Sequence, residues 1–102
     1  MTRGSDDQLT ALRAQIDDLD RELVELLARR FEVTREVGRL KAQQGLPSLD
    51  EQREFAQRER LCVLASGSGV DPDTVLAVFD TIVARVRAEH DAIRRATGDA
   101  AA

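Results

Sequence analysis

The sequence predicts an all-α protein with three helices per chain, one long and two shorter. Apolar residues recur at alternating intervals of three and four positions from Leu9 onward, which is the pattern of a helix that buries one face. The chain is 42% hydrophobic but only 3% aromatic, which favours an aliphatic helical core over a β-sandwich. Its 102 residues correspond to one domain.

The first helix is expected from about Gln8 to about Gln44. Its apolar stripe consists of Leu9, Leu12, Ile16, Leu19, Leu23, Leu26, Val33, Val37 and Leu40. Gly38 lies inside this pattern, where a glycine allows another backbone or a ligand to approach closely. The run Gly45-Leu46-Pro47 has the glycine-then-proline order that ends a helix.

The second helix is expected to begin at a capping box, with Ser48 as the N-cap and Glu51 reaching back to it. The first half of this helix is nearly all polar and its second half is apolar. We expect it to run to about Ala65, followed by a loop at 67–69, where two glycines flank a serine.

The third helix is expected to begin with Asp71 as the N-cap and Pro72 in the first helical position. Its apolar face consists of Val75, Phe79, Ile82, Val83, Val86, His90 and Ile93. Gly98 is expected to mark its end.

The length of the first helix predicts an intertwined helical homodimer. About 36 residues of helix extend roughly 54 Å, whereas a compact domain of about 100 residues has a radius of gyration near ~13 Å. Two shorter helices cannot cover both ends of such a helix, so a second copy is expected to cover its stripe. The helical domain is expected at 8–96, between flexible segments at 1–7 and 97–102.

Charge and composition argue against several classes of function. The net charge is −4 and no basic block is interleaved with aromatic residues, so a nucleic-acid partner is not expected. One cysteine, Cys62, and one histidine are too few for a Cys/His metal site. The polar, acidic start is unlike a signal peptide, and no apolar run reaches membrane-spanning length. We therefore expect a cytoplasmic protein with no membrane partner and no metal.

Arg30 interrupts the stripe of the first helix at a position where the spacing predicts an apolar residue. Lys41 follows three helical turns later, and at about 100° per residue it returns to within about 20° of the same face. Two cations on the inner side of a helix are unfavourable unless an anion meets them. The pair therefore predicts a pocket for a small anion inside a helical bundle.

Four motifs occur along the first helix and the loop after it: an LRxxID start at Leu12–Asp17, the double arginine Arg29–Arg30, the late Lys41, and a D-x-x-RE segment at Asp50–Glu54. In these motifs the chain resembles the all-α (AroQ-type) chorismate mutases, from about Leu9 to Ile93 and most weakly in the third helix. The resemblance implies a homodimer that converts chorismate to prephenate in aromatic amino acid biosynthesis. This intramolecular rearrangement requires no nucleophile, metal or cofactor.

The resemblance assigns roles to three cations of the first helix. Arg13 corresponds to the arginine that enters the partner chain's active site, and Arg30 to the arginine that binds a substrate carboxylate. Lys41 corresponds to the lysine that bonds the ether oxygen and a carboxylate. These residue types suit the chemistry, because the planar arginine fork binds carboxylates in bidentate fashion. A fixed donor at the ether oxygen stabilises the charge that grows there.

Asp50 and Glu54 correspond to the acidic pair near the substrate hydroxyl, with Arg53 as the arginine between them. Two residues of the third helix depart from the family. His90 stands where the family usually has Gln, sometimes Glu, as the second donor to the ether oxygen, and Val86 stands where a serine is common. A neutral imidazole donates one N–H and a charged one donates two, so we expect His90 to serve as a donor.

Two sister activities on the same scaffold remain open because of His90: isochorismate-pyruvate lyase and 4-amino-4-deoxychorismate mutase. A further alternative is a helical dimerisation or regulatory module without catalysis, in which Arg30 fixes the register of a coiled coil. Register alone requires neither Lys41 nor Asp50 and Glu54, so the sequence favours the chorismate mutase interpretation. The ligand of each catalytic alternative is a small dicarboxylate.

Overall fold

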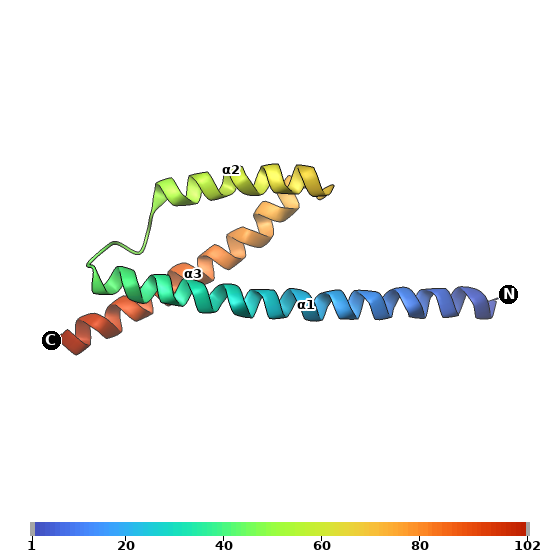
Figure 1. The fold of residues 1–102 in the computed structure, drawn as a ribbon, viewed down its shortest axis with the longest axis horizontal. Coiled ribbons are helices and arrows are strands. Elements are labelled where there is room, and N and C mark those ends of the chain that lie inside the picture. The colour runs from blue at the N-terminus through green and yellow to red at the C-terminus, as the bar shows by residue number, and fades with distance from the viewer. Residues whose placement is uncertain (1, 102) are drawn as a thin grey trace. The chain divides into compact units, whose positions relative to one another are not determined.

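A computed structural model describes residues 2–101, with side chains placed for residue 4 and residues 6–98. It contains three helices, α1 (Thr2–Gln43), α2 (Glu51–Ser68) and α3 (Pro72–Ala101) (Figure 1). Residues 2–101 contain no strand, so the prediction of an all-α chain with one long and two shorter helices is confirmed. The chain divides into two compact parts, Met1–Val33 and Thr34–Ala102.

The first part is a single stretch of α1 whose apolar stripe is exposed. Leu19 is 61% exposed and Leu23 is 60% exposed, and the other stripe residues up to Val33 are exposed as well. Helix α1 begins at Thr2, earlier than the start near Gln8 that the apolar pattern predicts. The difference arises because the pattern marks where a face becomes apolar, whereas helical hydrogen bonding extends into the polar residues before it.

Helix α1 ends as the glycine signal predicts. Gly45 adopts a left-handed conformation with φ of 69°. The amide of Leu46 donates to the carbonyl of Lys41 at 2.8 Å, and the amide of Gly45 donates to the carbonyl of Ala42 at 3.3 Å. These two bonds form a Schellman motif, which satisfies carbonyls at the helix end.

Helix α2 begins later than expected, so the capping box at Ser48 is a wrong prediction. The N-cap is Asp50, in an extended conformation, and its carboxylate accepts a hydrogen bond from the amide of Arg53 at 3.0 Å. Both residues have side chains suited to capping. Asp50 is the cap because residues 44–50 form the non-helical connection between α1 and α2, and the first helical residue is Glu51.

Helix α2 also continues further than expected, through Gly67 to Ser68, so the loop predicted at 67–69 is reduced to its last residue. Gly69 takes the left-handed conformation with φ of 75°, and the amide of Val70 closes the motif on Ala65 at 3.0 Å. Of the two glycines, Gly67 stays inside the helix, and Gly69, which adopts the positive φ, ends it.

Helix α3 begins at Pro72, and Asp71 accepts hydrogen bonds from the amide and hydroxyl of Thr74 at 3.2 and 2.9 Å. The predicted cap and first helical residue are therefore confirmed. The helix does not end at Gly98 but runs to Ala101. Gly98 keeps a helical backbone, since its φ is not positive.

Helices α2 and α3 contact each other and form the core of the second part (Figure 1). Leu61 and Ala65 of α2 are buried, as are Ile82 and His90 of α3. The whole apolar face predicted for the third helix is buried or half-buried. No helix within residues 2–101 is long and apolar enough to cross a membrane.

Candidate functional site

Lys41 and Asp50 line one surface cavity of about 370 Å³, where the end of α1 meets the start of α2. The half-buried Lys41 donates from Nζ to the backbone carbonyl of Ser48 at 3.5 Å. This contact lies at the long end of the hydrogen-bonding range, so it is readily exchanged for a stronger acceptor. The structure thus brings together a predicted cation and a predicted carboxylate of the site.

The start of α2 places three predicted residues within one helical turn. The Asp50 carboxylate caps the helix on the amide of Arg53, which fixes the side chain of Asp50 beside the Lys41 cavity. The side chain of Arg53 is exposed. Glu54 is half-buried, and its backbone amide donates to the carbonyl of Asp50 at 3.0 Å. Glu54 lies on the side of α2 that faces α3, since its carboxylate meets Arg87 of that helix.

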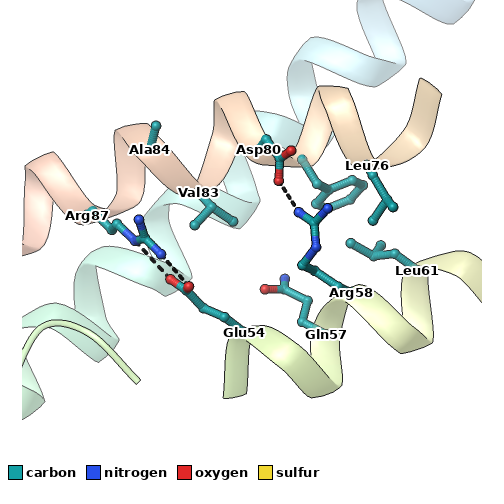
Figure 2. A pocket seen from close by; sticks show the side chains of 10 residues that line it. Glu54, Gln57, Arg58, Leu61, Leu76, Asp80, Val83, Ala84 and Arg87 are labelled. Carbon is teal, nitrogen blue, oxygen red and sulfur yellow. Dashed lines mark hydrogen bonds and ion pairs between the residues drawn. The ribbon is translucent and has the colours of Figure 1, made fainter. Parts of the chain in front are cut away.

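Glu54 forms a bidentate ion pair with Arg87 of α3 (Figure 2). Nε of Arg87 donates to Oε1 of Glu54 at 2.9 Å, and Nη2 donates to Oε2. The hydrogen bond to Glu54, together with the charge of the carboxylate, raises the pKa of the Arg87 guanidinium above its usual value. Arg87 is a residue of this site that the sequence analysis did not identify.

A second cavity, of about 230 Å³, lies between α2 and α3 beside this ion pair (Figure 2). The Glu54–Arg87 pair lines it together with Leu61, Phe79 and Val83. A second pair, between Arg58 and Asp80, also joins the two helices there. Charged groups therefore border an apolar floor, which is the usual composition of a site for a small polar ligand.

His90 is buried against α1 within the second part of the chain. It is 6% exposed, and Nε2 lies 2.6 Å from the backbone carbonyl oxygen of Thr34. Because a carbonyl oxygen only accepts hydrogen bonds, Nε2 carries the proton and donates a hydrogen bond to the carbonyl of Thr34. The ring also lies against Gly38, where an added Cβ would be 2.6 Å from Cδ2 of His90. The close approach expected at Gly38 is thus made by a side chain.

Beside His90, the carboxylate of Glu89 binds Arg35 of α1. Nε of Arg35 lies 3.1 Å from Oε2, and Nη2 lies 3.2 Å from Oε1. Arg85 approaches the same carboxylate at 3.4 Å. The sequence did not single out Arg35, which joins α1 to α3 through Glu89, the residue before His90.

The remaining predicted residues lie elsewhere. Val86 is half-buried on α3, next to Arg87 in sequence. Arg13 and Arg30 belong to the first part of α1, where Arg13 is exposed and Arg30 is half-buried. Arg30 is therefore more shielded than most of the leucines along the same stripe.

The fold and this arrangement define a small helical protein in which a lysine and a carboxylate line one cavity, an ion pair borders a second, and an imidazole is buried between α3 and α1. Residues 12–91 match the chorismate mutase type II family. Because the match covers most of the chain, this protein belongs to that family. The matched region includes every predicted site position from Arg13 to His90.

Three relatives illustrate the range of the family. The chain is 40% identical to the T-protein of Haemophilus influenzae over 67 residues, which make up 66% of this chain and 18% of that protein. It is 27% identical to the chorismate mutase of Methanocaldococcus jannaschii over 77 residues, 76% of this chain and 78% of that protein. It is 26% identical to the 4-amino-4-deoxychorismate mutase of Streptomyces venezuelae over 86 residues, 84% of each. This chain therefore spans less than a fifth of the length of the T-protein that it matches.

Proposed function

We propose that this chain is a chorismate mutase, which converts chorismate to prephenate. The family match over residues 12–91 carries this proposal, because it spans all the positions at which the chain resembles the active site of such enzymes. In the reaction one C–O bond breaks while one C–C bond forms within the same molecule. Catalysis then consists of holding a flexible dianion in its compact conformer and stabilising the charge that develops on the ether oxygen.

In this proposal three residues of the second part of the chain contact the substrate: Lys41, Asp50 and Glu54. Lys41 donates to the ether oxygen and to a carboxylate, and its long contact with Ser48 supports this role because it is easily replaced. Asp50 and Glu54 accept from the substrate hydroxyl. The shared cavity of Lys41 and Asp50 supports the grouping of these two residues, whereas Glu54 lines the second cavity, between α2 and α3. Arg53 lies between the two carboxylates in sequence.

The proposed second donor to the ether oxygen is His90, with Val86 one turn before it on α3. Arg30 binds a substrate carboxylate, and Arg13 reaches the site of a second chain. The half-buried position of Arg30 on a stripe of exposed leucines supports its assignment, since that position is already partly shielded from water.

The working form of the protein that we propose is a homodimer. The exposed stripe of α1 supports it, because Leu12, Ile16, Leu19 and Leu23 are each more than half exposed in the single chain. Contiguous apolar surface of this kind marks an interaction site, and a second copy offers a matching stripe. Sedimentation should give twice the monomer mass, with an unfolding midpoint that rises with protein concentration. A well-folded monomer at micromolar concentration would contradict the shared site. We place this dimer in the cytoplasm.

A second candidate activity is that of a 4-amino-4-deoxychorismate mutase. The relative of that name from Streptomyces venezuelae supports it, since the similarity covers 84% of both chains. The two substrates differ at the group that Asp50 and Glu54 are proposed to meet. A hydroxyl and an amino group both donate hydrogen bonds to carboxylates, so the acidic pair by itself does not separate them.

Product analysis separates these activities. The purified chain is incubated with chorismate, isochorismate and 4-amino-4-deoxychorismate in separate reactions, and the products are identified by chromatography and mass spectrometry. We expect prephenate from chorismate, and loss of that activity in Lys41→Ala. Pyruvate released from isochorismate as the preferred reaction would instead identify a lyase. No turnover of any of the three by a folded dimer would favour the non-catalytic module.

A further inference from the structure

Arg87 and Glu54 form a bidentate polar contact between α2 and α3. The planar guanidinium meets both oxygens of the carboxylate, with Nε donating to Oε1 at 2.9 Å and Nη2 donating to Oε2 (Figure 2). Such a fork fixes the rotation of a carboxylate as well as its position, which a single donor does not. Each oxygen of Glu54 retains a lone pair for a further donor.

Stability alone does not account for this pair. The Arg87 side chain is 50% exposed and that of Glu54 is 28% exposed, and ion pairs open to solvent contribute little to folding. The Arg58–Asp80 pair already links the same two helices, although its carboxylate is more exposed than that of Glu54. Glu54, in contrast, is the residue at which the chain resembles an acidic group near a substrate hydroxyl, and it lines the cavity between the helices.

We propose that Arg87 is a positioning residue that holds the Glu54 carboxylate in the orientation that receives the substrate, and that it offsets the charge of that carboxylate. The inference rests on the proposed function, because it takes Glu54 as a substrate contact. The substrate class is a small dianion, which an unpaired carboxylate would repel. With Arg87 in place, Glu54 presents oriented acceptors to a hydroxyl without adding net negative charge to the site.

The two effects of Arg87 are separable by substitution. Arg87→Met removes both the fork and the charge, whereas Arg87→Lys keeps the charge and loses the fork. We expect Arg87→Met to raise KM for chorismate by roughly tenfold or more, with a smaller change in kcat, because a substrate contact weakens. Arg87→Lys should recover part of the loss in KM and should serve as the test variant if Arg87→Met does not fold.

A double-mutant cycle shows whether Arg87 acts through Glu54. When Glu54→Gln has already removed the carboxylate, adding Arg87→Met should change KM by less than about threefold, since coupled residues are not additive. The matched control is Arg21→Met, which likewise removes an arginine from an ion pair, here the exposed pair with Asp18 on α1. We expect it to change KM by less than about threefold in either background, because mutations without a shared partner act independently.

The outcomes distinguish this inference from the proposed function. If the parent protein does not turn over chorismate, or if Glu54→Gln has the kinetics of the parent, the site assignment fails and the inference fails with it. If Glu54→Gln is impaired while Arg87→Met keeps the parent KM, the site stands and the inference is overturned. An equal effect of Arg87→Met with and without Glu54 would also overturn it, because the residue would then act on the fold in general.

Discussion

The imidazole ring of His90 occupies the space that a side chain on residue 38 would need. A Cβ added to Gly38 would lie 2.6 Å from Cδ2, 3.1 Å from Nε2 and 3.2 Å from Cγ of His90. The first of these distances is far inside van der Waals contact, and the ring is held in place by Thr34. Glycine in a helix interior is less favourable than alanine by about 1 kcal/mol, and here it allows α1 and the imidazole to meet.

We predict that Gly38→Ala changes the sign of its effect on stability with the residue at position 90. In the parent, overpacking against the ring should destabilise the fold by roughly 1–3 kcal/mol. In a His90→Ala background the clash is absent, so Gly38→Ala should stabilise by up to about 1 kcal/mol through helix propensity. The free energy of unfolding from urea titration measures both effects.

The matched control for this cycle is Gly67→Ala, at a helical glycine of α2 with nothing within 4 Å of an added Cβ. It should be neutral or stabilising in both backgrounds, by up to about 1 kcal/mol. If Gly38→Ala stabilises the parent as Gly67→Ala does, the imidazole of His90 does not need the space that a Cβ on residue 38 would fill, and the prediction is wrong.

For Arg30 we predict that activity and stability respond in opposite ways. Arg30→Leu completes the apolar stripe of α1 and should leave the unfolding midpoint equal or higher, because replacing a partly buried charge by an apolar residue is often favourable. The same change should lower kcat/KM by about 10²–10³, the loss expected when a charge-assisted bond to the transition state is removed. Arg39→Leu, at an exposed arginine of the same helix, is the control for surface charge. Loss of folding with full activity in the folded fraction would assign Arg30 a structural role instead.

The sequence predicted those features of the fold that depend on local chemistry. Helical periodicity located α1 and α3, and the start at Pro72 and the end at Gly45 follow from residues that act on their own backbone. Choices between equivalent signals were not predictable. Ser48 and Asp50 are both good caps, and the path of residues 44–50 decides between them. Gly67 and Gly69 likewise differ only in which one adopts the positive φ.

The sequence proposes which residues form the site, but it does not predict the contacts that they make. Arg87 follows Val86 in sequence, and nothing local indicates that it meets Glu54, because that pairing depends on how α2 and α3 are aligned. The contact of His90 with Thr34 is similar, since it joins residues on two helices. An amphipathic pattern shows which face of a helix is buried but not the residue on the neighbouring helix that each side chain reaches.

Mixing of two inactive variants tests whether Arg13 serves the site of a partner chain. Arg13→Ala and Lys41→Ala should each be inactive as homodimers. A mixed dimer has one site with both defects and one with neither, so a fully exchanged equal mixture should recover about a quarter of the parent activity if chains pair at random. Subunit exchange is confirmed by mass spectrometry of differently tagged chains. If exchange occurs and activity does not return, Arg13 acts within its own chain or outside the site.

The last prediction concerns the proton that His90 supplies. Nε2 already donates to the carbonyl of Thr34, so a neutral ring has no second N–H for a substrate oxygen, whereas the imidazolium has one on Nδ1. If His90 donates to the ether oxygen while it keeps its bond to Thr34, the second N–H comes from Nδ1 of the doubly protonated ring. Glu89, the residue before His90, pairs with Arg35 of α1 at 3.1 Å and with Arg85 of α3 at 3.4 Å.

Substitution at position 90 separates the donor role from core packing. His90→Gln carries two N–H groups on one amide, so it can donate both to Thr34 and to the substrate and should retain the reaction. His90→Ala should lower kcat/KM by roughly 10²–10³, the effect of deleting one donor to a developing oxyanion. The value of kcat/KM for chorismate is measured for all three proteins under matched conditions, after circular dichroism has confirmed their folding. If His90→Ala turns over chorismate at the parent rate, the ring serves only to fill the space above Gly38, and the donor role is wrong.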